Sequence, residues 1–183
     1  RASGRHMVFD HHQVQEALYG RLIEQLREEY HGALAEALEA RTGAAEIDPA
    51  ELEGDLAVDL CEHFLKGARG RQARRYLDAA LSHLERGHLP ALACRLAERA
   101  LGVRGLVTGA DRAHLLWRMA RENGPLQLVG RKDAELAALE EILRLLPPGT
   151  DDRARGRALM ALGLCVLWGA RRAEAKGLLD EAL

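Results

Sequence analysis

The residues best suited to metal chemistry are eight histidines and three cysteines, and their spacing does not bring them together. His11 and His12 are neighbours, so they point in different directions on a helix. His83 and His88 lie on either side of a predicted turn, and neither stands at a metal-binding spacing from a cysteine or glutamate. We therefore predict no metal site, and we expect His11 and His63 to hydrogen-bond at helix ends or between helices.

The three cysteines, Cys61, Cys94 and Cys165, are widely separated and occupy apolar helical positions. Such cysteines behave as small hydrophobic residues and remain reduced in a cytoplasmic protein. The chain has no apolar run of about 18 residues, the length that would span a membrane, and no signal peptide. We therefore expect a cytoplasmic protein that does not bind a membrane.

Paired carboxylates are the remaining candidates for acid–base chemistry. Neighbouring residues on a helix diverge, and acidic residues at a helix start complement the helix dipole. No nucleophile with a base accompanies them, and no phosphate-binding loop is present. We predict no catalytic activity and no cofactor for this chain. The pairs are Glu28 with Glu29, Glu140 with Glu141, and Asp151 with Asp152.

Five basic side chains form the densest charge cluster of the chain, at Lys66, Arg69, Arg71, Arg74 and Arg75. Nucleic-acid binding would need this patch to extend along a face with aromatic residues or a groove-entering helix. Only Tyr76 is close, on the predicted buried side, so nucleic acid is not the expected partner. A solvated turn, or a contact with an acidic protein surface, agrees better with the pattern.

The net charge of −2 conceals a strong polarity along the chain. Residues 10–62 contain 14 acidic and 3 basic side chains, whereas residues 66–131 contain 13 basic and 5 acidic ones. Opposite charges of this kind steer partners and set association rates. One interpretation is that the acidic first helix of one copy binds the basic middle of another.

Apolar residues recur every three or four positions along nearly the whole chain, which predicts an all-α protein of about seven or eight helices. β-branched residues are scarce and no segment alternates, so strands are not expected. Short turns make successive helices antiparallel neighbours. The predicted helices are 10–42, 49–66, 72–86, 90–101, 111–123, 133–146 and a final pair within 152–183.

The first helix carries apolar residues four positions apart, at Leu22, Leu26, Tyr30, Leu34 and Leu38. Such a continuous stripe predicts a buried face. The glycines at positions 20 and 32 each cost a helix about 1 kcal/mol relative to alanine. We expect either one long helix or two with a break near one of these glycines, ending at positions 42 and 43.

Proline and aspartate mark the later helix boundaries. Asp48 is expected to cap the second helix, with Pro49 in its first position. Gly124 and Pro125 should interrupt a later helix, because proline lacks a backbone donor and clashes with the preceding turn.

We divide the chain into three segments. Residues 1–7 are expected to be a vector-derived remnant, and residues 8–46 a long helix or helix pair that packs on the helices after it. Residues 47–183 are expected to form helical repeats. Because the chain begins just before one helix and ends inside another, we expect a fragment of a larger protein, truncated at its C-terminus.

Two helix pairs repeat one pattern, in which a small residue stands midway along the first helix and alanine recurs along the second. The pattern is typical of tetratricopeptide repeats, whose roughly 34-residue period is kept only loosely here. One such unit cannot bury its apolar face alone, so we predict a right-handed superhelical α-solenoid of antiparallel helix pairs. The positions are Gly163, Ala175, Leu179 and Ala182 in the last pair, and Cys61, Phe64, Ala73, Leu77 and Ala80 in an earlier one.

The opening stretch FDHHQVQEALYGRL resembles a segment of bacterial multidomain signal-transduction ATPases. Residues 62–81, EHFLKGARGRQARRYLDAAL, resemble the next signature of those proteins, a helix ending in His-Phe, a glycine turn and an Ala-x-x-Tyr-Leu helix. The resemblance covers nearly all of residues 9–183 and departs at Gly124 and Pro125. In that family the segment comes after a nucleotide-binding module and is often fused to a Ser/Thr kinase, a nucleotide cyclase or a LuxR-type domain. None of the family's catalytic motifs lies in these residues.

The resemblance implies a concave groove lined by the first helix of each pair. The two tryptophans fall on such helices. One interpretation is a groove for a peptide or helix of a partner. The other is that these side chains pack under a further repeat. The predicted partner-binding residues are Trp117, Arg118, Arg121, Arg157, Met160, Leu164, Leu167 and Trp168.

The sequence therefore favours a non-catalytic regulatory arm of a bacterial signalling protein, a sensor or scaffold. It would bind a partner protein or the parent protein's own catalytic domain, and so shift an equilibrium between inactive and active forms. Two alternatives stay open: a homo-oligomerisation scaffold, and a small-ligand sensor domain of a transcription regulator.

Overall fold

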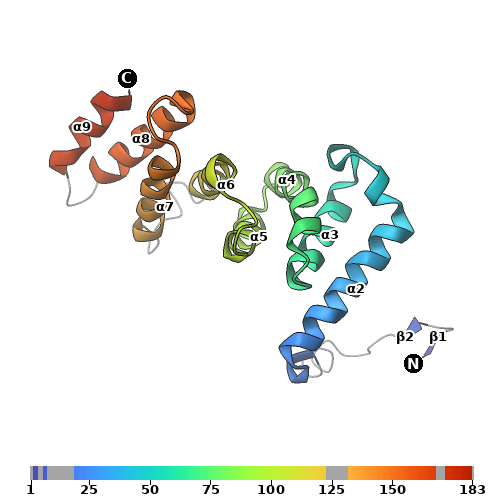
Figure 1. Cartoon of the computed structure of the whole chain (residues 1–183). Helices are drawn as coiled ribbons and strands as arrows, with labels where there is room; N and C mark the ends of the chain where they lie inside the picture. The colour runs from blue at the N-terminus through green and yellow to red at the C-terminus, as the bar shows by residue number, and fades with distance from the viewer. Residues whose placement is uncertain (1, 4–5, 8–18, 123–131, 168–171, 183) are drawn as a thin grey trace. The chain divides into compact units, whose positions relative to one another are not determined.

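The computed structural model describes residues 2–3, 6–7, 19–122, 132–167 and 172–182. Apart from turns and one pairing of two-residue strands, the described residues are helical, as the apolar periodicity predicts (Figure 1). Gly124 and Pro125, where an interruption is predicted, lie outside the described residues. The strands β1 (Ala2–Ser3) and β2 (His6–Met7) pair antiparallel. The helices are α2 (Glu24–Thr42), α3 (Gly54–Lys66), α4 (Gly70–Arg86), α5 (Pro90–Gly102), α6 (Gly109–Glu122), α7 (Lys132–Leu145), α8 (Asp152–Leu167) and α9 (Arg172–Ala182), with the short 3-10 turns η1 (Ala44–Glu46) and η2 (Pro49–Glu51).

The chain forms two compact units, Arg1–Ala80 and Leu81–Leu183, and the division falls inside α4. In the first unit α2 packs on α3. In the second unit each helix from α5 to α9 packs on the next one. The sequence predicts a boundary between residues 8–46 and the helical repeats of residues 47–183. This boundary separates repeats rather than compact units, so it stays a prediction.

The core of the first unit includes the stacked rings of Phe64 on α3 and Tyr76 on α4, whose centroids lie 6.1 Å apart. Both side chains are fully buried. The Tyr76 hydroxyl donates a hydrogen bond of 2.5 Å to the Glu39 carboxylate, which ties α4 to α2. Burial, together with this hydrogen bond, raises the pKa of Tyr76 to about 12. The phenol therefore stays protonated and keeps its role as a donor at neutral pH.

The apolar stripe of the first helix is not buried, contrary to the sequence prediction. Leu26, Tyr30 and Leu34 are exposed, whereas Gly32 and Ala35 on another face of α2 are buried. The small residues face α3 because they let the two backbones approach closely. Leu26, Tyr30 and Leu34 consequently point to solvent, and Leu38 is half-buried.

The closest approach in this unit joins Gly32 of α2 to Gly67 at the end of α3. A Cβ atom on Gly67 would lie 2.4 Å from the Gly32 backbone nitrogen and 2.6 Å from its Cα atom. Gly67 has a φ of −85°, which other residues also adopt, so the close contact is what requires glycine there. We refer to this contact as the glycine crossing.

Gly32 does not break the first helix. The break lies at Leu22 and Ile23, close to Gly20, and helical residues 19–21 precede it. One of the two predicted break positions is thus confirmed. The C-terminal stop is also confirmed, since Gly43 has a left-handed φ of 67° at the end of α2.

The second helix begins later than the sequence predicts. Asp48 accepts a hydrogen bond of 2.9 Å from the backbone N–H of Ala50, but it caps only the turn η2. Leu52 then adopts an extended backbone conformation, and Glu53 is also non-helical. The α-helix α3 therefore starts at Gly54, and the prediction that Pro49 opens it is wrong.

One buried cluster of the second unit is shared by α6, α7, α8 and α9, and Gly163 lies at a close contact of the last two helices. A Cβ atom on Gly163 would lie 2.9 Å from both Cγ and Cδ2 of Leu179. The small residue predicted midway along the first helix of the last pair thus marks a close helix contact. The buried core residues are Ala113, Leu116, Ala120, Leu139, Ile142, Leu146, Ala158, Leu162, Val166 and Ala175.

Candidate binding surfaces

One face of α8 carries exposed residues of the predicted partner-binding set. Arg157, Met160 and Leu164 are all exposed, and spacings of three and four place them on one side of the helix. Met160 and Leu164 are 49% and 47% exposed. Two large apolar side chains one turn apart, beside an arginine, form a surface suited to contact rather than solvation. We call these three residues the α8 face.

The neighbouring helices hold α8 in place and leave this face open. Asp151 caps the helix by accepting a 3.0 Å hydrogen bond from a backbone N–H of the first turn. Arg155 donates to two carbonyls at the end of α7, at 3.1 and 2.8 Å. The same guanidinium binds Glu181 of α9 at 2.6 Å. The α8 face is thus presented by a helix that is fixed from two sides.

Trp117 and Arg118, from the same predicted set, have structural contacts on α6. Trp117 is half-buried against the core of the second unit. Arg118 donates to Glu85 at 2.6 Å and to the Ser82 hydroxyl at 3.1 Å. The side chains of Arg118 and Glu85 are only 21% and 16% exposed.

The remaining members of that set are not brought to this surface. Trp168 and the side chains of Arg121 and Leu167 lie outside the described part of the chain. Of the eight predicted residues, the structure therefore brings Arg157, Met160 and Leu164 together on one surface.

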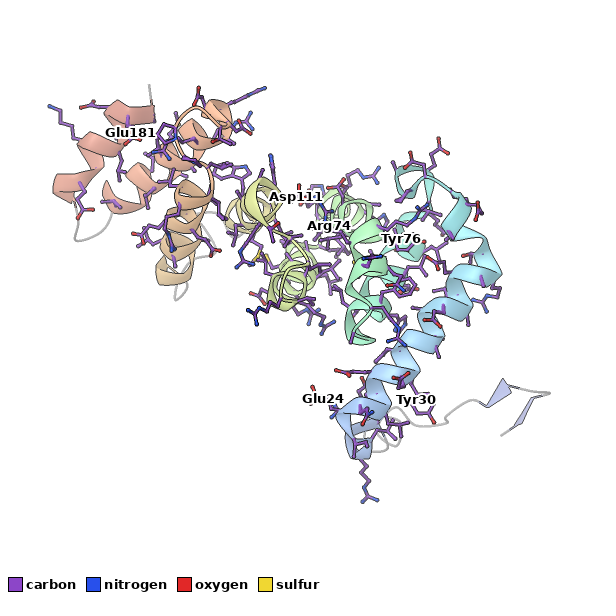
Figure 2. All side chains as sticks on the ribbon, viewed as in Figure 1. Glu24, Tyr30, Arg74, Tyr76, Asp111 and Glu181 are labelled. Atoms are coloured by element: carbon purple, nitrogen blue, oxygen red, sulfur yellow. The ribbon has the colours of Figure 1, made fainter. Side chains whose placement is uncertain are left out.

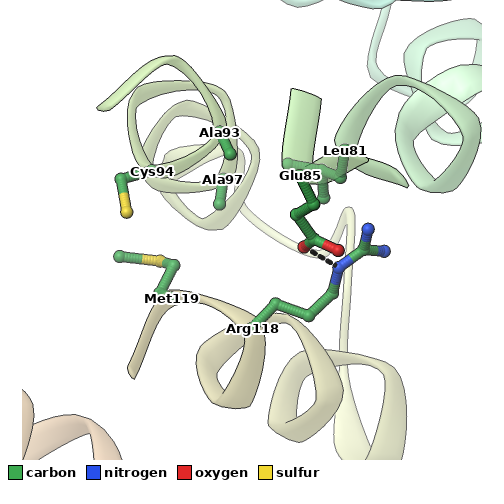
Figure 3. A pocket seen from close by; sticks show the side chains of 7 residues that line it. All are labelled: Leu81, Glu85, Ala93, Cys94, Ala97, Arg118 and Met119. Atoms are coloured by element: carbon green, nitrogen blue, oxygen red, sulfur yellow. Dashed lines mark hydrogen bonds and ion pairs between the residues drawn. The ribbon is translucent and has the colours of Figure 1, made fainter. Parts of the chain in front are cut away.

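A hollow beside the Glu85–Arg118 pair is lined by side chains of α4, α5 and α6 (Figure 3). Apart from the ion pair its lining is apolar, with Cys94 and Met119 opposite each other. Cys94 is buried, as expected for a reduced core thiol. The lining has no second polar group that would orient a ligand, so the hollow belongs to the packing of these helices.

The basic run of the sequence is largely engaged by the chain itself. Lys66 forms an ion pair with Glu62 at 2.7 Å. Arg75 donates to two carbonyls of the turn before α3, both at 2.8 Å, and lies 5.8 Å from the centre of the Tyr76 ring. Arg71 is exposed.

Arg69 spans the glycine crossing. Its guanidinium lies 3.6 Å from Glu29 and 3.5 Å from Glu36, two acidic residues of α2. The acidic surface that this arginine contacts is therefore on the same chain. Part of the basic run therefore holds α2 in place through ion pairs.

A chain of hydrogen bonds that the sequence did not reveal connects α2 to α3. The Tyr19 hydroxyl lies 2.8 Å from Nε2 of His31, and Nδ1 of His31 lies 2.8 Å from Nδ1 of His63. Two proton orders satisfy both contacts: Tyr19 donates to His31 and His31 to His63, or His63 donates to His31 and His31 to Tyr19. His63 thus hydrogen-bonds between helices, as predicted, whereas its partner 32 residues away could not be read from local spacing.

Burial lowers the pKa of His63, and the charge of Lys66 acts in the same direction. Asp59 and Glu62 oppose this shift. Protons on both Nδ1 atoms would also set two N–H groups against each other across 2.8 Å. The contact between the two Nδ1 atoms therefore holds only one proton.

Lowering the pH from about 8 to about 5 should weaken the attachment of α2 to α3. The pKa of His63 is lower in the folded than in the unfolded chain, so the unfolded chain takes up its proton first. Stability is then lost as the pH falls through the ordinary histidine value of 6.5. Amide hydrogen exchange of α2 across this range measures the loss. His63→Asn keeps an amide near the position of Nδ1 without titrating, and an unchanged pH dependence in that variant would contradict the prediction.

The second exposed apolar surface lies on α2. Ile23, Leu26, Tyr30 and Leu34 are 69%, 39%, 60% and 51% exposed. Tyr30 projects from the helix in Figure 2. These four residues stand three or four positions apart and so share one side, the spacing of a coiled-coil contact. We call them the α2 face.

The described residues show no other kind of site. Within those ranges, no three histidine, cysteine or acidic side chains gather as ligands for a metal ion. No helix among them has both the length and the hydropathy needed to cross a membrane. No protein-family model, curated protein or solved structure matches the chain. The functional assignment therefore rests on the two helix faces and on the sequence patterns.

Proposed function

We propose that this chain is a non-catalytic protein-interaction arm of a bacterial signalling protein, built as a tetratricopeptide-like solenoid. Two helix pairs support the repeat. The Cys61 thiol lies 3.6 Å from the Ala73 carbonyl, and a Cβ atom on Gly163 would lie 3.6 Å from the Ala175 carbonyl. In both pairs the small residue of the first helix lies near the carbonyl of an alanine 12 residues later. The interval from Cys61 to Gly163 also equals three lengths of the roughly 34-residue unit.

The exposed α8 face carries the binding role. Met160 offers a flexible, polarisable side chain, and Leu164 offers a branched one, so the pair can receive the apolar side of an amphipathic helix. Arg157, one turn before Met160, would select an acidic residue on the edge of that helix. The expected partner is therefore a helix with an apolar stripe and an acidic edge.

Regulation would result from binding. A partner, or the parent protein's own catalytic domain, shifts an equilibrium if it contacts the α8 face in only one of two states. The bacterial signalling context rests on the sequence resemblance. A homo-oligomerisation scaffold is the second candidate, because the α2 face is also exposed and apolar.

Replacing Leu164 with glutamate should weaken the binding of a helical peptide at least tenfold. Helical peptides selected from a random library on the wild-type chain serve as the probe, and calorimetric titration gives their dissociation constants. A tenfold loss corresponds to about 1.4 kcal/mol, the scale expected for a residue at the centre of a contact.

Leu89→Glu is the matched control, because Leu89 is similarly exposed, at 44%, on the turn between α4 and α5 of the same unit. It should bind the selected peptides as the wild type does. Failure to select any peptide, or equal affinity for the wild-type and Leu164→Glu chains, would overturn the proposed function.

A further inference from the structure

The edge of the α2 face is acidic. Glu29 and Glu36 lie between this face and the Gly32 side that contacts α3, and their side chains keep 65% and 56% exposure although both contact Arg69. The helix thus combines an apolar stripe with carboxylates that remain accessible from outside. It has the chemistry that the α8 face is expected to select.

The α8 face is basic at one end and apolar at the other. Arg153 and Arg157 are exposed near the start of the helix, and Met160 and Leu164 come after them on the same side. The spacings of four, three and four residues form a continuous seam. On the α2 face, Ile23, Leu26 and Tyr30 come before Leu34 along the helix.

An antiparallel pairing brings the apolar parts of the two seams together. Both helices rise about 1.5 Å per residue, so a register that sets Tyr30 against Met160 also sets Leu26 against Leu164. Four exposed apolar side chains would then leave water in one contact. A parallel pairing would set Leu26 toward the arginine end instead.

The same antiparallel register matches the charges. Glu36 of α2 comes level with the turn between Arg153 and Arg157 of α8, within reach of either guanidinium. Arg41, exposed at the end of α2, comes near the start of α8, where Asp152 is exposed. Opposite charges therefore face each other at one end of the apolar contact, beyond Tyr30 of α2 and before Met160 of α8.

We infer that the α2 face of one copy of this chain docks antiparallel on the α8 face of a second copy. The inference rests on the proposed function, because it names the helix that occupies the α8 face. The contact is heterologous, so each copy retains one free α2 face or one free α8 face. Association therefore continues head to tail and grows with concentration.

The contact is small and partly ionic, which sets its expected strength. A single helix pair buries less than the roughly 800 Å² per partner of a standard stable interface. Dissociation constants in the micromolar range are expected, with clear weakening as the salt concentration rises and shortens the Debye length.

Mixing two complementary variants of the full chain tests the inference. One variant carries Tyr30→Glu and Leu34→Glu on α2, and the other carries Met160→Glu and Leu164→Glu on α8. Each variant alone should be monomeric in sedimentation experiments, because every copy lacks the same half of the contact. Their mixture should form a one-to-one heterodimer, whereas the wild type should form larger species as its concentration rises.

Several results would overturn the inference. These are a wild type that stays monomeric at all concentrations, a mixture that stays monomeric, and an α8 variant that dimerises alone. The last result would mean that two α2 faces pair with each other. Selection of peptides on the α8 face is a separate measurement, so a helix-binding surface without self-association would leave the proposed function standing and remove only α2 as its occupant.

Charge reversal gives a second, milder pair of variants should the glutamate substitutions disturb folding, which circular dichroism would reveal. Glu36→Arg and Arg157→Glu each place like charges at the contact, so each alone should self-associate at least tenfold more weakly than the wild type. In the mixture both contacts between unlike variants join opposite charges, so association should recover. Absence of that recovery would overturn the predicted register.

Discussion

Replacing Gly67 with alanine should weaken the packing of α2 on α3 by about 3 kcal/mol, a large effect for one methyl group. The new Cβ atom would lie 2.4 Å from the Gly32 nitrogen and 2.6 Å from its Cα atom. Both are backbone atoms, so no side chain can rotate away and the two helices must separate. Separation would also stretch the 2.8 Å contact between His31 and His63. Amide hydrogen exchange along α2 measures the effect as faster exchange.

Gly20→Ala is the matched control for this substitution. Gly20 belongs to the same unit, and an added Cβ atom there meets nothing within 4 Å. Alanine at this helical position should leave exchange unchanged or slow it, because glycine destabilises a helix by up to about 1 kcal/mol. If Gly67→Ala exchanged no faster than the wild type, the glycine crossing would not determine the attachment of α2.

The positions of the helices could be predicted because their signals are local. Gly43 ends α2 in a left-handed conformation, and Pro90 opens α5 at a position where its missing N–H costs nothing. Asp48 shows the limit of such signals. A local cap started a turn of only three residues, and the non-helical backbone of Leu52 and Glu53 then decided where the α-helix began.

The buried side of α2 could not be predicted from periodicity. Two stripes run along this helix, one of large apolar residues and one of small residues, and a hydrophobic pattern selects the first. Packing selected the second, because Gly67 of the α3 end meets Gly32 there. The available signal was Gly32 itself, a glycine inside a helix.

The residues of the candidate site also differ in whether local sequence could predict their role. Arg157, Met160 and Leu164 could be predicted together, because helical spacing alone places them on one side of α8. Arg118 could not be assigned, because its partner Glu85 is 33 residues away on another helix. An exposed arginine and an arginine held by an ion pair have the same local sequence pattern.

Replacing Arg118 with methionine should destabilise the second unit by about 2 to 3 kcal/mol. The Glu85 carboxylate is 16% exposed and would lose a charged partner at 2.6 Å. Removing one member of a largely buried pair is destabilising because the desolvation of the other is no longer offset. Methionine keeps much of the apolar stem, so lost packing contributes little. Urea unfolding followed by tryptophan fluorescence measures the effect, since both tryptophans belong to this unit.

A double variant and a binding assay separate this structural role from partner binding. Glu85→Gln with Arg118→Met should be less destabilised than the sum of the two single variants, because the charge left without its arginine is removed. Below its unfolding range, Arg118→Met should bind peptides selected on the α8 face as tightly as the wild type does. Retained stability with lost peptide binding would instead make Arg118 a contact residue. Loss of stability with intact binding would mean that Arg118 stabilises the packing of α6 on the end of α4.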